Sequence, residues 1–353
     1  MTCVPGGFHA VRFRTLCWLA TATILWAAPL TAQTSAFVSF DAPDGGTGSG
    51  QGTRPTAINQ NGVIAGFYID QGGLLHGFVR HATGQITEFD APIFSSTTVT
   101  GINRNGQIVG YGSIISSLHG FLRSASGKFT KIQVSGSTDT LPSAINDNGE
   151  ITGTYYDPAG LRHGFLRDAG GNYTLFDDPN AGNNEHQGTF AVAINGSGEI
   201  AGYYQDVNDI FHGFIRDQLG NFTSFDAPGA GTRVFTGTTP AAINLSGEIT
   251  GYFSDDNLVT HAFVRDTSGS VSVFDAPGST LTLANGINDN GKVLGYWMIR
   301  HSTRGFVRNS VGKLSSYSVP VSGANTYPAG INNGGLFTGA YAVLRGPYHG
   351  FLD

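Results

Sequence analysis

Residues 57–70 read AINQNGVIAGFYID, and close relatives of this stretch recur along the chain. The recurrences are GINRNGQIVGY at 101–111, AINDNGEITGTYYD at 144–157, AINGSGEIAGYYQD at 193–206, AINLSGEITGYFSD at 242–255, GINDNGKVLGYW at 286–297 and GINNGGLFTGAY at 330–341. Consecutive copies lie 43 to 49 residues apart. A repeat of this length has the size of one four-stranded β-unit, which must stack against neighbouring copies to bury its faces.

Turn residues divide each repeat into strands. The pairs that follow Ile-Asn, such as Asn61-Gly62 and Gly334-Gly335, favour tight hairpins because they tolerate positive φ. A first strand (a) therefore ends at Ile-Asn, and the alternating run after the turn is a second strand (b). The third strand (c) contains His-Gly-Phe, and the fourth (d) usually ends in Phe-Asp-Ala-Pro, where the proline indicates an outer edge.

The numbers of these strands indicate how the chain closes. Strands a, b and c each occur seven times, but strand d occurs only six times after residue 57, at 86–92, 129–134, 173–179, 222–228, 271–277 and 314–320. The missing copy, FVSFDAP, lies at 37–43, near the other end of the chain. We therefore predict an all-β, seven-bladed β-propeller with four antiparallel strands per blade, in which the N-terminal strand completes the last blade. Such closure removes exposed sheet edges.

The third strand also carries a family resemblance. His261-Ala262-Phe263 occurs once, and the variant His-Gly-Phe begins at 76, 119, 163, 212 and 349. On these triplets the chain resembles the extracellular HAF repeat family. The resemblance extends over residues 33–353 and implies a secreted bacterial protein with propeller-like repeats. It implies no particular activity.

The first 32 residues differ from the repeats and are typical of a signal peptide. Arg12 and Arg14 precede an uncharged, mostly apolar run at 16–30, and Leu30-Thr31-Ala32 offers small residues for cleavage. A retained membrane anchor is the alternative, but the run is shorter than the roughly 20 residues that a span needs. We expect residues 33–353 to be one propeller domain that is secreted, either extracellular or periplasmic.

Composition limits the partners of the exported chain. Cys3 and Cys17 are the only cysteines, so cleavage would leave no disulfide and no thiol. Removing Arg12 and Arg14 changes the formal charge from −6 to −8, and no basic tract remains. These features argue against nucleic acid and anionic membranes as partners. We expect a monomer with no membrane insertion after signal cleavage.

A repeated histidine lies at the start of strand c. In four repeats an aspartate precedes it by six residues: Asp70 and His76, Asp157 and His163, Asp206 and His212, Asp255 and His261. We interpret each pair as a structural hydrogen bond across the b–c loop, because a metal site needs three or four convergent ligands. We also interpret the Phe-Asp aspartates as structural, because they recur in most repeats, at positions 41, 90, 177, 226 and 275.

No HExxH, GxSxG or P-loop motif occurs in the sequence. We therefore predict no cofactor, no metal and no catalytic residue.

Residues that occur once, on variable loops, are better candidates for function. In a four-stranded blade the d–a and b–c loops share one face, and three d–a links, at 44–56, 180–192 and 229–241, are longer than the others. The candidate ligand-binding residues on these links are Arg54, Asn183, Asn184, Glu185, His186, Phe190, Arg233 and Phe235. The atypical b–c loop of the repeat at 286–320 adds Trp297, Arg300 and Arg304. Aromatic rings beside directional polar groups are typical of carbohydrate or peptide sites.

These residues support three hypotheses. The first is a secreted binding module for a polysaccharide or an extracellular protein. The second is a carbohydrate-active enzyme, a glycoside hydrolase or lyase, with Glu185 or His186 as acid or base near Arg233; it is disfavoured because glycosidases need two carboxylates. The third is a structural surface or matrix protein.

Overall fold

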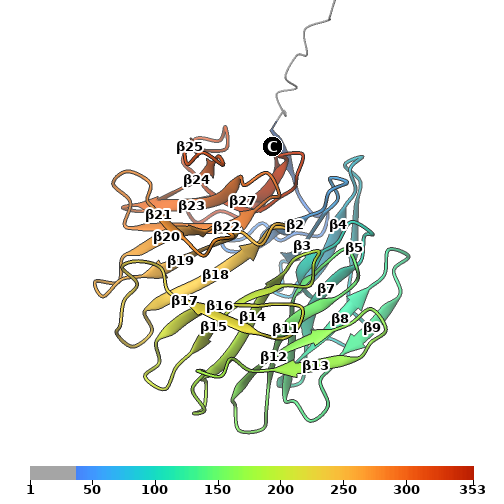
Figure 1. Ribbon diagram of the computed structural model, residues 1–353. Helices are drawn as coiled ribbons and strands as arrows, with labels where there is room; N and C mark the ends of the chain where they lie inside the picture. Colours follow the sequence, from blue (N-terminus) through green and yellow to red (C-terminus); the bar gives the residue numbers. More distant parts are fainter. Residues whose placement is uncertain (1–36) are drawn as a thin grey trace, which may run out of the picture. The chain divides into compact units, whose positions relative to one another are not determined.

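The computed structural model describes residues 37–353, which form strands and loops without any helix (Figure 1). The predicted signal peptide at 1–32 lies outside these residues. Within the described part of the chain, no helix is long and apolar enough to cross a membrane.

The strands follow the predicted order a, b, c, d in every repeat. Strands a are β2 (Gly52–Ile58), β6 (Thr98–Ile102), β10 (Asp139–Ile145), β14 (Gly188–Ile194), β18 (Gly237–Ile243), β22 (Leu281–Ile287) and β26 (Ala324–Ile331). Strands b are β3 (Ile64–Ile69), β7 (Ile108–Ile114), β11 (Ile151–Tyr156), β15 (Ile200–Gln205), β19 (Ile249–Ser254), β23 (Val293–Ile299) and β27 (Phe337–Val343). Strands c are β4 (Leu75–Arg80), β8 (Ser117–Arg123), β12 (Arg162–Arg167), β16 (Phe211–Arg216), β20 (Thr260–Arg265), β24 (Ser302–Arg308) and β28 (His349–Leu352). Strands d are β5 (Ile86–Phe89), β9 (Phe129–Ile132), β13 (Tyr173–Phe176), β17 (Phe222–Phe225), β21 (Val271–Phe274), β25 (Leu314–Tyr317) and β1 (Val38–Phe40).

Within each unit, neighbouring strands pair antiparallel in the order a-b-c-d, as in β2-β3-β4-β5 and β6-β7-β8-β9. The units between β10 and β25 are also joined to each other by single parallel pairs, for example Arg162 with Gly188. This is the arrangement of a β-propeller.

The N-terminal strand completes the last unit, as predicted. β1 pairs antiparallel with β28, with Val38 opposite Leu352 and Phe40 opposite Gly350, so the sheet order is β1-β28-β27-β26. β1 ends at Phe40 rather than continuing to Pro43. The other d strands that precede a proline also end before it, as β17 does at Phe225, three residues before Pro228.

The hydrophobic core is a series of clusters between neighbouring sheets. The phenylalanine of strand c is fully buried in every unit: Phe78, Phe121, Phe165, Phe214, Phe263, Phe306 and Phe351. Phe214, for example, packs with Ile200 of its own unit and Phe176 of the preceding one. The glycine of strand b makes room for this ring, since a Cβ on Gly202 would lie 2.5 Å from the ring of Phe214. Each buried ring contributes roughly 1.5–3 kcal/mol.

Two further kinds of contact join neighbouring units. The side-chain amide of Asn59 donates to the carbonyl of Asn103, and the same bond links Asn103 to Asn146, Asn146 to Asn195, Asn195 to Asn244, Asn244 to Asn288 and Asn288 to Asn332. Asn332 donates back to Asn59, so the series is closed. In five units, in addition, the arginine that ends strand c stacks on an aromatic ring of the preceding unit, as Arg216 does 4.7 Å above Phe176.

Candidate ligand-binding face

The three long d–a links are shorter than the sequence suggested. Strands β2, β14 and β18 begin at Gly52, Gly188 and Gly237, within the predicted loops. All three glycines have positive φ, and a Cβ on Gly188 would lie 2.0 Å from the carbonyl oxygen of Arg162 in the neighbouring strand c. The close approach of two strands therefore requires glycine at these positions.

As a consequence, Arg54 and Phe190 are strand residues, and their assignment to loops was wrong. Both are half-buried. The Arg54 guanidinium lies 3.9 Å from the ring centroid of Tyr348, and Phe190 stacks on Tyr203 with ring centroids 4.4 Å apart. The Arg54 contact joins neighbouring units, and the guanidinium of Arg162 from the preceding unit lies 5.0 Å from the Phe190 ring centroid, so neither side chain lies on the outer surface.

Two of the long links are joined through one residue of the b–c loop between them. Gln187 Nε2 donates to Asp209 Oδ1 at 2.9 Å, and Phe235 N donates to the Asp209 carbonyl at 2.8 Å. The structure therefore brings together loops 180–187 and 229–236, as the sequence suggested. Asp209, Phe235 and His186 all have φ between 62° and 71°. Left-handed backbone is uncommon outside glycine, costs on the order of 1–3 kcal/mol per residue and clusters at functional sites.

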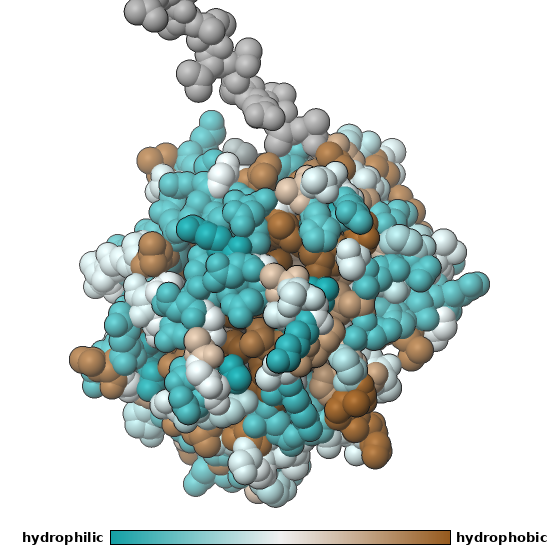
Figure 2. Space-filling view, turned by 90° about the vertical axis from the view of Figure 1, so that its right-hand side faces the viewer, coloured by the Kyte–Doolittle hydropathy of each residue, from teal (hydrophilic) through white to brown (hydrophobic). Residues whose placement is uncertain are grey.

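A surface cleft lies beside this junction. Its volume is 660 Å³, and it is lined by Asn208, Ile210, Thr232, Arg233, Val234 and Leu258. Arg233 Nη1 donates to the Asp256 carbonyl at 2.9 Å, which holds the guanidinium at the edge of the cleft. Phe235 is 65% exposed and follows the lining residue Val234 directly. Aliphatic walls and a positioned cation thus lie together in the cleft, and the exposed Phe235 is the next residue along the chain. Figure 2 shows how hydrophobic patches alternate with hydrophilic ones over one face of the molecule.

The remaining candidates of loop 180–187 lie on the outer surface. Asn183, Asn184, Glu185 and His186 are all exposed. Glu185 Oε1 lies 3.4 Å from His186 Nε2, so these two groups face each other. Arg162 supports the loop from below, because its guanidinium stacks on Phe190 and Nη1 donates to the His186 carbonyl.

Of the three candidates from the atypical b–c loop, Trp297, Arg300 and Arg304, only the two arginines lie on the surface. Trp297 was predicted to be a rim residue, but it lies in β23, is 7% exposed and packs in the core with Phe306. Its place in the ligand-binding set is therefore wrong. Arg300, in the β23–β24 turn, and Arg304, in β24, are exposed. The Arg304 guanidinium lies 5.8 Å from the Trp297 ring, so the tryptophan supports this arginine from beneath.

The repeated histidines have a nearer partner than the predicted one. His212 Nδ1 lies 3.0 Å from an oxygen of Asp226, the Phe-Asp aspartate of strand d, whereas Nε2 lies 3.8 Å from Asp206. Its ring also stacks on Tyr204. The same cluster recurs at His76, His163 and His261, and His349 pairs with Asp41 of the N-terminal strand. The hydrogen bond to Asp226 outweighs burial and raises the pKa of His212.

One unit lacks this acidic partner. His119 is followed 14 residues later by Gln133, not aspartate, and its buried Nδ1 has no hydrogen-bond partner within the described residues. Burial, followed by the charge of Lys131, lowers the pKa of His119. A second unit has Arg304 in place of the histidine. Repetition of the histidine–aspartate pair in the other five units supports a structural role for these clusters.

Several tyrosines that were not among the predicted site residues lie close together. Tyr296 and Tyr327 of neighbouring units meet edge to face with ring centroids 5.7 Å apart, and Tyr327 contacts Tyr348. Burial raises the pKa of both Tyr203 and Tyr252. The sequence does contain a pattern that could have identified these residues, because tyrosine follows the strand b glycine in four repeats, at 111, 203, 252 and 296. Within residues 37–353, no group of three or more His, Cys, Asp or Glu side chains could hold a metal ion.

Comparisons with known proteins support the fold. No family model matches the chain, and no curated protein sequence matches it. Among solved structures, virginiamycin B lyase from Staphylococcus aureus is 14% identical with a TM-score of 0.59, over 90% of this chain and 99% of the lyase. The β-propeller domain of the Trilobed protease from Pyrococcus furiosus is 9% identical with a TM-score of 0.57, over 89% of this chain and 93% of that domain. A lectin from Burkholderia pseudomallei is 10% identical with a TM-score of 0.52, over 85% of this chain and 98% of the lectin. At these identities the likeness concerns the fold alone, and this chain has the fold of a β-propeller.

Proposed function

We propose that the chain is a secreted, monomeric β-propeller of seven blades, related to the HAF repeat proteins, that binds a polysaccharide on the face of its d–a and b–c loops. The closed series of asparagine hydrogen bonds from Asn59 to Asn332 supports the blade number. The cleft of 660 Å³ beside Phe235 and Arg233 carries the proposal for the site.

The chemistry of the cleft suits a sugar chain. A pyranose ring presents an apolar face of C–H groups and a rim of hydroxyls, so it needs a flat apolar surface together with directional polar groups. Phe235, Val234 and Leu258 offer the first, and Arg233 and Asn208 offer the second. The volume lies within the roughly 300–1,000 Å³ that is usual for small-molecule sites.

The same cleft favours binding over hydrolysis. A glycosidase needs two carboxylates at a defined separation across the scissile bond. None of the six residues that line the cleft is acidic. The nearby Glu185 faces His186 rather than a second carboxylate.

The test is a glycan array followed by calorimetric titration of the best-binding oligosaccharide. We expect Phe235→Ala and Arg233→Ala each to weaken binding by about tenfold, the effect of losing roughly 1.4 kcal/mol at a central contact. Leu219→Ala and Lys128→Ala are matched controls, because both residues are exposed on the c–d turns at the opposite end of the strands. Unchanged affinity in both rim variants, or no glycan bound on the array, would contradict the proposal, and release of products from a polysaccharide panel would favour the enzyme.

A further inference from the structure

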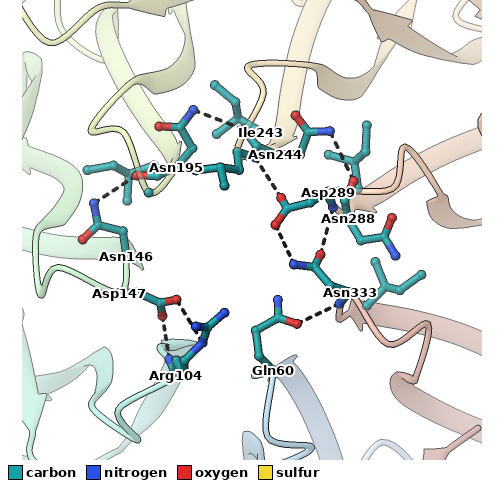
Figure 3. A pocket seen from close by; sticks show the side chains of 15 residues that line it. Gln60, Arg104, Asn146, Asp147, Asn195, Ile243, Asn244, Asn288, Asp289 and Asn333 are labelled. Atoms are coloured by element: carbon teal, nitrogen blue, oxygen red, sulfur yellow. Dashed lines mark hydrogen bonds and ion pairs between the residues drawn. The ribbon is translucent and has the colours of Figure 1, made fainter.

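A second cavity lies at the other end of the strands, where the a–b turns of all the units surround an open centre (Figure 3). Its volume is 240 Å³. This axial cavity is separate from the cleft beside Arg233.

The cavity is lined by the most variable position of the a–b turn motif. Every repeat has Ile-Asn at the end of strand a, but the next residue differs in nearly every unit: Gln60, Arg104, Asp147, Gly196, Leu245, Asp289 and Asn333. The turn itself is built by the constant asparagine, as where Asn244 Oδ1 accepts from Glu248 N. The side chain of the variable residue is therefore not needed to form the turn, so it can contact a ligand in the cavity instead.

The charges around the cavity do not balance. Arg104 Nε lies 3.6 Å from Asp147 Oδ2, so these two groups compensate each other. Asp289 accepts hydrogen bonds from Leu245 N and from the Asn333 amide. Among residues 37–353 it forms no ion pair, so its negative charge has no counter-ion.

Apolar side chains form part of the lining beside this carboxylate. Isoleucines 194, 243, 287 and 331 line the cavity, together with Leu245 and several asparagines. Gly196 also lines it, and a Cβ at this position would lie 3.0 Å from the end of the Leu245 side chain. The cavity thus combines one uncompensated carboxylate with a partly hydrocarbon lining.

We propose that the axial cavity binds a small organic cation, a primary ammonium carried on a compact hydrocarbon. The ammonium donates to Asp289, and the hydrocarbon packs against the isoleucines and Leu245. A hard metal ion would need six or more oxygen ligands. Here the Asn333 amide and Asp147 are already engaged with neighbours, so a hydrogen-bond donor on an apolar body fits better.

The experiment titrates the protein with three ligands of one shape at pH 7: cyclohexylammonium, cyclohexanol and cyclohexanecarboxylate. We expect calorimetry to detect binding of the ammonium and at least about tenfold weaker binding of the other two. Asp289→Asn keeps the hydrogen-bond acceptor but removes the charge. Gly196→Leu adds to the lining the side chain that the next unit carries, and so reduces the volume of the cavity. Both should weaken ammonium binding by about tenfold or more.

Asp256→Asn is the matched control, since it removes one exposed carboxylate from the other face. It should bind the ammonium like the unaltered protein. Circular dichroism would confirm that all variants are folded. Equal binding of the neutral or anionic ligand, no ammonium binding, unchanged affinity in Asp289→Asn, or displacement of the ammonium by millimolar calcium would each overturn the proposal.

Discussion

Replacing His212 with alanine should destabilise the protein without affecting ligand binding. The change removes the hydrogen bond between Nδ1 and Asp226 at 3.0 Å and the stack on Tyr204, whose ring centroid is 5.0 Å away. A charge-assisted hydrogen bond contributes about 1.5–3 kcal/mol, and the lower end applies because the histidine side chain is 23% exposed. The stack adds roughly 0.5–1 kcal/mol. We therefore expect a loss of about 2 kcal/mol in the free energy of unfolding.

This loss should depend on pH. The pKa of His212 is raised in the folded protein, so the stabilisation is fully present below the unfolded pKa of about 6.5 and declines as the pH rises through the folded pKa. Urea unfolding, followed by circular dichroism at pH 6 and pH 9, measures both values. His81→Ala is the control, because His81 lies exposed on a c–d turn outside the clusters.

Three results would refute the reasoning. They are a loss below about 0.5 kcal/mol at pH 6, a larger loss at pH 9 than at pH 6, or a variant that unfolds normally but no longer binds the glycan. The last result would show that the histidine contributes to ligand binding rather than to stability.

Three other changes test the scaffold. Gln133→Asp should supply the acidic partner that His119 lacks and raise stability by about 1 kcal/mol at pH 6 in the same urea assay; no gain would show that the acidic partner does not stabilise this unit. Deleting residues 33–43 removes β1 and exposes the edge of β28, so we expect aggregation on size-exclusion chromatography; a monomer with an unchanged melting temperature would contradict closure. Asn332→Ala breaks the bond that closes the asparagine series and should cost about 1–3 kcal/mol, whereas the exposed Asn105→Ala should cost little; equal losses would deny the series a special role.

Most of the strand pattern was predictable because the same order of strands and turns recurs in every repeat. Hairpin residues such as Asn61-Gly62 mark the a–b turns, and the count of d strands placed Phe37 to Pro43 beside the last unit. The contacts between units could not be predicted from the repeated sequence pattern. The bond from Asn59 to Asn103 joins residues that are far apart in the chain, and only the packing of adjacent units reveals it.

The differences from the predictions have physical causes as well. The predicted aspartate, six residues before the histidine, does lie beside it, with Asp206 3.8 Å from His212. Strand d runs beside strand c, however, and brings Asp226 closer, to 3.0 Å. The fixed spacing of 14 residues was the missed signal. Trp297 was placed on a loop because its unit lacks the usual aspartate, yet β23 continues to Ile299 and turns that ring into the core.

Location of the bound glycan is the most direct test of the proposed function. Hydrogen–deuterium exchange, with and without the oligosaccharide that binds best on the array, reports which backbone amides the ligand protects. We predict protection at 206–210 and 229–236, the loops that meet at Asp209. Protection confined to the a–b turns around Asn146 and Asn288, or no change in exchange on either face, would contradict it.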